Sequence, residues 1–215
     1  MIVSRSRPRR LVRAWQFDPN LVLYLPLYKL DGASFKSADR YSHLCTVTGA
    51  LWTPQGRTFD GTDDYITVPH NAVFDFGTGA FTWIVWFKSG DTATAWQRIL
   101  SKGDAGGLYT RIGSNTIATA VGGDDLGSFP FTDTTTFHQL AIIRTGGNAY
   151  AYLDLVLQDT VASVGNVNVA TDLTIGIRHD LTEDFTGKVG EVLAYNRGIS
   201  VTELTQINQA TKGRY

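Results

Sequence analysis

Hydrophobic residues along this chain fall in short runs, separated by turns rich in glycine, aspartate, asparagine and proline. Runs of this length, bounded by turn residues, are typical of β-strands. At least eleven strands are expected, at residues 21–28, 57–60, 64–69, 81–88, 98–103, 107–113, 116–121, 138–144, 148–158, 172–177 and 188–196. They do not alternate with helical patterns, which favours two antiparallel sheets stacked face to face over an α/β fold. The predicted fold class is therefore an all-β, two-sheet antiparallel sandwich.

One strand and one helix are predicted in more detail. The run at 81–88 is apolar at successive positions, so it predicts a central strand that is buried on both faces. Trp83 and Trp86 lie on opposite faces of that strand, and core packing is expected for both. Near the end of the chain, Ser200 and Glu203 form a capping-box pattern, which predicts a helix of about three turns. We expect this helix to close one end of the sandwich.

Composition agrees with one large domain that spans residues 20–215. Charged residues make up 18% of the 215 residues, aromatic residues make up 12%, and 22 glycines are available for turns. Nineteen basic and 20 acidic side chains leave a formal net charge of −1, so nucleic acid is not an expected partner. No apolar run reaches the roughly 18 residues of a membrane span, so no membrane partner is expected. The single cysteine, Cys45, excludes a disulfide within the chain.

The first 19 residues differ from the rest of the chain. Residues 1–17 carry five arginines and no acid. Pro8 argues against a helix, while the apolar residues beside the arginines argue against a freely solvated tail. We therefore expect residues 1–19 to form an extended basic N-terminal arm that docks on a neighbouring subunit. Its predicted contact residues are Arg5, Arg7, Arg9, Arg10, Arg13, Trp15 and Phe17.

Seven segments of the remaining chain, taken in order, carry a family resemblance. They are LVLYLPLY, RTFDGTDDYITVP, AFTWIVWFK, ILSKGD, FHQLAIIRTGGNAYAYLD, LTIGIR and FTGKVGEVLAYNRGISVTEL. Together they resemble the laminin G-like domains of the concanavalin A-like jelly rolls, over nearly all of residues 21–210. The resemblance implies a jelly-roll sandwich, a fold that serves lectins, adhesion modules, glycosidases and structural proteins alike.

The chain lacks the residue patterns of common hydrolases. A retaining glycosidase on this fold needs two carboxylates on the same face of one strand. Instead, the three glutamates, Glu183, Glu191 and Glu203, are predicted in a loop, a strand and a helix. The four histidines form no close pair, and no GxSxG, P-loop or GxGxxG motif is present. We therefore expect a protein that is not an enzyme.

The resemblance also implies a structural calcium ion at the rim of the sandwich. In such domains an aspartate of the first long loop and an acid near the last strand hold the ion, which prefers oxygen ligands. Asp39 has the corresponding loop position and Glu191 the last-strand position. Gly190 stands where the family has an aspartate, which lowers the number of carboxylates. No other cofactor is expected.

Carbohydrate binding is suggested by the loops between strands. Trp96 offers an aromatic platform, and Asp124 and Asp125 offer hydrogen-bond acceptors for sugar hydroxyls. The competing interpretation is that these residues form solvated turns. Glycans are therefore expected partners in one of the two functions considered for this chain.

The other function, which the arm favours, is assembly. No apolar stretch of a signal peptide follows the arginines, and the chain resembles stand-alone laminin G-like proteins of tailed phages. We expect a non-enzymatic virion protein, made in the host cytoplasm and used for capsid decoration or in the tail. Its arm would bind neighbouring copies of the chain or other virion proteins. The alternative is a lectin-like adhesion module that binds carbohydrate.

Overall fold

The computed structural model describes residues 14–104, 106–163 and 165–215. Within these ranges the chain forms sixteen strands, one α-helix and three short 3₁₀ helices. The strands are β1 (Leu21–Pro26), β2 (Ser34–Lys36), β3 (Leu44–Thr48), β4 (Leu51–Thr53), β5 (Gly56–Asp60), β6 (Tyr65–Val68), β7 (Phe81–Ser89), β8 (Gln97–Lys102), β9 (Leu108–Gly113), β10 (Thr116–Val121), β11 (Asp124–Pro130), β12 (His138–Thr145), β13 (Asn148–Leu153), β14 (Val156–Ala162), β15 (Leu173–Ile175) and β16 (Thr186–Tyr195). The helices are η1 (Ala14–Phe17), η2 (Ala72–Phe74), α1 (Val201–Thr211) and η3 (Lys212–Arg214).

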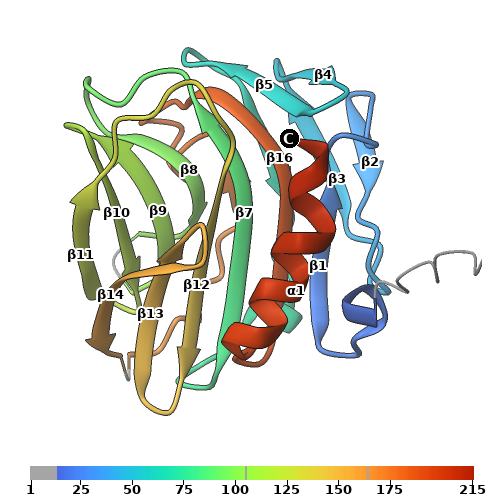
Figure 1. The fold of residues 1–215 in the computed structure, drawn as a ribbon. Coiled ribbons are helices and arrows are strands. Elements are labelled where there is room, and N and C mark those ends of the chain that lie inside the picture. Colours follow the sequence, from blue (N-terminus) through green and yellow to red (C-terminus); the bar gives the residue numbers. More distant parts are fainter. Residues whose placement is uncertain (1–13, 105, 164) are drawn as a thin grey trace, which may run out of the picture.

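The strands form two eight-stranded sheets, called sheet A and sheet B here. Sheet A has the order β14-β13-β12-β7-β16-β5-β4, and β1 pairs with the second half of β16. Sheet B has the order β11-β10-β9-β8-β15-β6-β3-β2. Every pairing in both sheets is antiparallel, and the sheets lie face to face around one large core (Figure 1). The prediction of an all-β, two-sheet jelly-roll sandwich with one short C-terminal helix is confirmed.

Strand β7 is buried on both faces, as its sequence predicts. It lies between β12 and β16, so neighbouring strands satisfy its backbone on both sides. Trp83 joins the core between the sheets, while Trp86 faces the outer side of sheet A. There the Trp86 indole N–H donates to the Thr211 hydroxyl at 2.9 Å, and the ring lies beside Tyr215. Core packing of both tryptophans is therefore confirmed.

Helix α1 begins at the predicted capping box. The Ser200 hydroxyl accepts a hydrogen bond from the Glu203 backbone N–H, and the Glu203 carboxylate accepts one from the Ser200 N–H. The expectation that this helix closes an end of the sandwich is wrong, because α1 lies across the outer face of sheet A (Figure 1). Its buried Leu204 and Ile207 share a second hydrophobic cluster with Ile84 of β7 and with other residues of that face.

The expected strand at 148–158 is divided by a turn into β13 and β14. Asp154 and Leu155 adopt positive φ angles of 50° and 71°, which reverse the chain. A leucine rarely adopts this conformation, and the turn contains no glycine or asparagine that would indicate it. Strand β11 was also not expected, because Asp124 and Asp125 were interpreted as turn residues and instead begin that strand.

None of the helices in the described ranges is both long and apolar enough to span a membrane.

His138, at the start of β12, is held between two carboxylates. Its Nδ1 lies 2.6 Å from Asp154 Oδ2, and its Nε2 lies 3.2 Å from Asp133 Oδ2. The hydrogen bond to Asp154 and the charges of both carboxylates raise the pKa of His138 above its ordinary value, although burial opposes them. Protonated His138 therefore ties the loop before β12 to the turn between β13 and β14.

This arrangement predicts a specific pH dependence of stability. Because the folded pKa of His138 is raised, its contribution is fully present below the unfolded pKa, about 6.5, and is lost as the pH rises through the folded value. We expect the melting temperature of the wild type to fall between about pH 6 and pH 9 by more than that of His138→Gln. Thermal unfolding at a series of pH values measures this difference. Parallel curves for the two proteins would show that the two carboxylates do not stabilise His138 in its charged form.

Candidate ligand-binding rim

Loops from distant parts of the sequence meet at one end of the sandwich. Thr186, the first residue of β16, pairs with Asp60 at the end of β5, and its backbone N–H donates to Gln97 Oε1 at 2.9 Å. The turn between β9 and β10 joins them, because the Ser114 N–H donates to the Thr94 carbonyl at 3.1 Å. Between these loops lies an open hollow of about 370 Å³. Its lining residues are Gly61, Asp91, Thr94, Ala95, Trp96, Gln97, Glu183, Asp184 and Thr186. We call it the rim hollow.

Trp96 has a fixed orientation in the rim hollow. The Arg111 guanidinium lies 4.1 Å from the centre of its ring, a cation–π contact. Arg111 also lies 5.5 Å from the Tyr109 ring, and the Arg98 guanidinium lies 3.8 Å from the same ring. These four side chains form an alternating ladder on strands β8 and β9 and the loop before them. The backbone of Gly113 lies so close that an added Cβ would come within 3.0 Å of Trp96.

Carboxylates surround the aromatic ring. Glu183 accepts a hydrogen bond from Arg98 Nε at 2.5 Å, and Arg178 lies 3.5 Å from its other oxygen. Asp91 accepts hydrogen bonds from the Ala93 N–H and the Thr94 hydroxyl, and the latter bond lowers its pKa. Both acids are thus held in place by neighbouring donors while they line the rim hollow.

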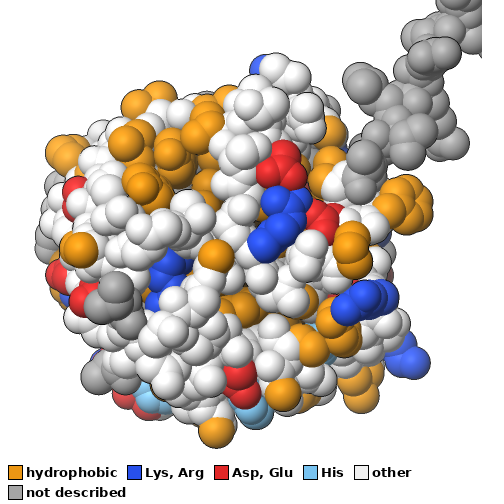
Figure 2. All heavy atoms as spheres, turned by 90° about the horizontal axis from the view of Figure 1, so that it is seen from below, with side chains coloured by type: hydrophobic (Ala, Val, Ile, Leu, Met, Phe, Trp, Pro, Cys, Tyr) orange, Lys and Arg blue, Asp and Glu red, His pale blue; other side chains and the backbone are white. Residues whose placement is uncertain are grey.

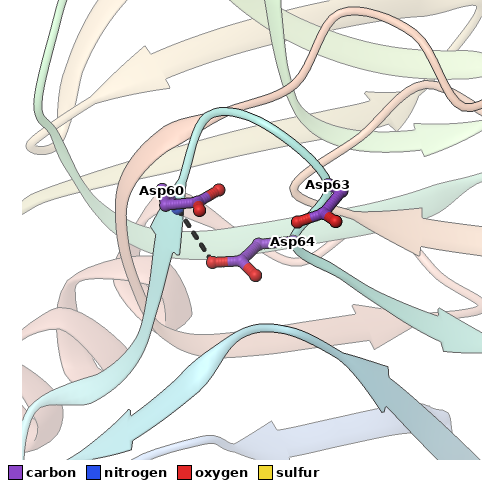
Figure 3. A group of neighbouring side chains, drawn as sticks. All are labelled: Asp60, Asp63 and Asp64. Atoms are coloured by element: carbon purple, nitrogen blue, oxygen red, sulfur yellow. Dashed lines mark hydrogen bonds between the residues drawn. The ribbon is translucent and has the colours of Figure 1, made fainter.

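Beside the rim hollow, the turn between β5 and β6 gathers three more carboxylates (Figure 3). One oxygen each of Asp60, Asp63 and Asp64 lies within 4.8 Å of the others. Burial of Asp64, opposed by a hydrogen bond from the Asp60 N–H, raises its pKa, and the charges of Asp60 and Asp63 add to the effect. Burial likewise raises the pKa of Asp184, helped by the same two charges. Oxygen ligands in this arrangement suit a hard cation such as Ca²⁺.

The sequence analysis did not select this acidic cluster as a site. The segment from Asp60 to Asp64 was interpreted as turn chemistry, which the structure also shows. Gly61 makes the turn possible, because its φ is +83° and an added Cβ would lie 2.0 Å from the Thr186 hydroxyl. Three aspartates within five residues of a tight turn were the available signal.

The residues predicted to bind calcium belong to two separate hydrogen-bond networks. The Asp39 carboxylate accepts backbone hydrogen bonds from Tyr24 at 2.9 Å and Tyr41 at 2.8 Å, which fixes the loop to β1. The buried Glu191 accepts hydrogen bonds from the Tyr24 hydroxyl and from Arg214, both at 2.6 Å. Arg214 thus supplies a positive charge beside Glu191 that the sequence analysis did not consider. Calcium binding by Asp39 and Glu191 stays a prediction.

The three residues predicted to bind carbohydrate do not converge. Trp96 lies near the start of β10, because it contacts Gly113. Asp124 and Asp125 follow the other end of that strand, where they pair with Val121 and Ala120. A six-residue strand separates the two ends by roughly 20 Å. The structure therefore places Trp96 with Asp91 and Glu183 instead, and sugar binding by Asp124 and Asp125 stays a prediction.

Part of the predicted arm contacts its own domain. The Trp15 ring packs edge-on against Tyr24 at 5.2 Å, and Asp18 forms an ion pair with Arg197 at 2.5 Å. Phe17 is 78% exposed. The five predicted arm arginines, Arg5, Arg7, Arg9, Arg10 and Arg13, lie outside the described residues. Docking of the arm on a neighbour, and the domain boundary at residue 19, stay predictions.

Solved structures share the fold of this chain. The sialidase of Trypanosoma rangeli, solved with sialic acid, matches with a TM-score of 0.69 and 17% identity, over 89% of this chain and 33% of the sialidase. The binding domain of botulinum neurotoxin serotype D matches with a TM-score of 0.70 and 13% identity, over 89% of this chain and 52% of that one. This chain thus spans a third to a half of their lengths. No curated protein matches it in sequence.

These comparisons correct one prediction. The expectation that the chain is not an enzyme is wrong as drawn from its fold and motifs, because the structures that it matches include a sialidase. At 17% identity, over a third of the sialidase, the match shows a shared fold and assigns no activity to this chain.

The family, in contrast, is shown by sequence. A laminin G model, described as concanavalin A-like lectin/glucanases superfamily, matches residues 60–205, which is more than half of the chain. The matched range contains the acidic cluster and every residue that lines the rim hollow. It confirms the resemblance that the seven segments indicated. The chain belongs to the concanavalin A-like lectin/glucanases superfamily.

Proposed function

We propose that this domain binds carbohydrate at the rim hollow. The observation that carries the proposal is the place of Trp96, whose ring lines the hollow together with Asp91, Glu183 and Gln97. A sugar ring packs its C–H face on an aromatic side chain, while its hydroxyls exchange hydrogen bonds with carboxylates and amides. The volume of about 370 Å³ lies within the range of small-molecule sites, roughly 300–1,000 Å³.

Two features prepare the rim hollow for a ligand. The Arg111 guanidinium holds the Trp96 ring on one side, so little side-chain entropy is lost when a sugar packs on it. The buried Arg98 fixes Glu183 through a charge-assisted hydrogen bond. Support also comes from the shared fold, since one structural neighbour is a toxin binding domain and another was solved with sialic acid.

The charges around the rim favour neutral sugars over acidic ones. Asp60, Asp63, Asp91 and Asp184 all lie in or beside the rim hollow. The basic side chains nearest to it, Arg98 and Arg178 among them, are already paired with carboxylates. A sialylated glycan would therefore meet repulsion here, unless a divalent cation occupied the acidic cluster.

A glycan array tests the proposal with two tryptophan variants. We expect the wild type to bind neutral glycans and Trp96→Ala to bind them about tenfold more weakly or worse, a loss of roughly 1.4 kcal/mol. Trp52→Ala is the matched control, because Trp52 is a partly exposed tryptophan on β4 outside the rim hollow. Equal binding by wild type and Trp96→Ala, or no glycan bound at all, would contradict the proposal.

The virion role stays a prediction. The capsid or tail location and the virion partners were inferred from the arm and from a resemblance, and the arm arginines lie outside the described residues. No described contact bears on that role, whereas several described contacts build the rim hollow.

A further inference from the structure

A second hollow lies at the opposite end of the sandwich. Strand β16 begins at Thr186 in the rim hollow and ends at Tyr195, which lines the second hollow. Ten residues of strand place the two ends roughly 30 Å apart. The second hollow has a volume of about 430 Å³, and we call it the basal hollow. Its walls include Trp15 of η1, Asn20 of the following turn, Tyr195, and Gln206 of α1.

Two polar atoms in the walls of the basal hollow lack partners. Tyr195 is 1% exposed, and its hydroxyl has no hydrogen-bond partner among the described residues. The buried indole N–H of Trp15 also has none. An unsatisfied buried polar group costs about 1–3 kcal/mol, so two beside one hollow are a notable expense of stability. Burial raises the pKa of Tyr195, which keeps its hydroxyl neutral and able both to donate and to accept.

The charged side chains of the basal hollow are, in contrast, already paired. Arg197 lies between Asp18 and Glu203, with its Nη2 2.5 Å from the first carboxylate and 2.6 Å from the second. Figure 2 shows this end of the molecule, where basic and acidic side chains lie side by side among hydrophobic ones. Two acids and one arginine leave an excess of negative charge, which disfavours anionic ligands. Ile199 and Ile207 add an apolar wall.

We propose that the basal hollow is a second saccharide-binding site, which takes one neutral sugar residue and makes the domain bivalent. A sugar hydroxyl satisfies the Trp15 indole N–H, a second hydroxyl pairs with the Tyr195 hydroxyl, and the C–H face packs on Ile199 and Ile207. The ligand class rests on the proposed function, while the location rests on these unpaired atoms. Two sites at opposite ends would let one monomer bridge two glycan chains.

The indole N–H resonances of the ¹⁵N-labelled protein test this inference. D-glucose, D-galactose and N-acetyl-D-glucosamine are each titrated to about 100 mM, which detects millimolar affinity. Trp15→Phe and Trp96→Phe assign the two resonances. We expect at least one sugar to shift the Trp15 resonance. We also expect Tyr195→Phe to weaken that binding several-fold while its melting temperature stays equal or rises, because the lost hydroxyl has no partner in the fold.

Tyr150→Phe on β13 is the matched control, and it should bind sugar at the basal hollow as the wild type does. A Trp15 resonance that no sugar moves, or equal affinity in Tyr195→Phe, overturns the inference. A lower melting temperature for Tyr195→Phe would show that its hydroxyl serves the fold, which also overturns it. The Trp96 resonance reports on the rim hollow separately, so failure of either site is recognised without the other.

Discussion

Replacing Arg144 with methionine is expected to lower the free energy of unfolding by about 3–5 kcal/mol, because three buried carbonyl groups would lose a charged donor. Arg144 of β12 is 1% exposed. Its guanidinium donates to the carbonyls of Gly77, Gly79 and Gly165 at 2.6, 2.8 and 2.7 Å, and it lies 4.8 Å from the Phe81 ring. One side chain thus joins two loops to the end of sheet A.

Urea unfolding measures this effect through the midpoint of the transition, provided that the slope is unchanged. Arg40→Met is the matched control, because Arg40 is exposed and its side chain bonds to the Tyr41 hydroxyl alone among the described residues. We expect the control to change stability by less than about 0.5 kcal/mol. A loss below about 1 kcal/mol in Arg144→Met would show that water replaces the guanidinium at these carbonyls.

Glu191→Met is expected to cost a similar amount, about 3–5 kcal/mol, because it breaks a buried ion pair and leaves the arginine behind. Glu191 is fully buried, and it accepts hydrogen bonds at 2.6 Å from both Arg214 and the Tyr24 hydroxyl. The pair connects β16 to η3 near the end of the chain, and Tyr24 connects it to β1. The substitution leaves Arg214 and Tyr24 without this acceptor.

A double variant separates the lost charge partner from the lost packing. Replacing both Glu191 and Arg214 with methionine removes the pair, and exchange of a buried pair for apolar side chains is often nearly neutral. We therefore expect the double variant to be more stable than Glu191→Met, as measured by urea unfolding. If the double variant were less stable by the sum of the two single effects, the two side chains would be energetically independent.

The sequence predicted those parts of the fold that have local signals. Helix α1 was found from Ser200 and Glu203, whose side chains form the capping box, and β7 from an apolar run that is buried on both faces. Strands β2 and β4 were not predicted, because three-residue strands with mostly exposed side chains carry no clear hydrophobic pattern. The side of the sheet on which α1 packs also depends on tertiary contacts that the sequence alone does not reveal.

The candidate site was predicted only in part, for a related reason. Trp96 was selected as an aromatic residue in a loop, but its partners come from segments as far apart as Asp91 and Glu183. The contact of Trp96 with Arg111 depends on the register between β8 and β9, in which Arg98 pairs with Arg111. Neither fact can be read from residue spacing within one segment. Asp124 and Asp125 looked equally suitable, yet the length of β10 separates them from Trp96.

The most direct test of carbohydrate binding at the rim is a titration of the ¹⁵N-labelled protein with the neutral glycan that binds best on the array. The account predicts that the Trp96 indole resonance and the backbone amides of Thr94, Ala95 and Asp184 shift with one common dissociation constant. It also predicts that these shifts disappear in Trp96→Ala. Shifts that leave these four residues unchanged while the glycan is bound would contradict the account.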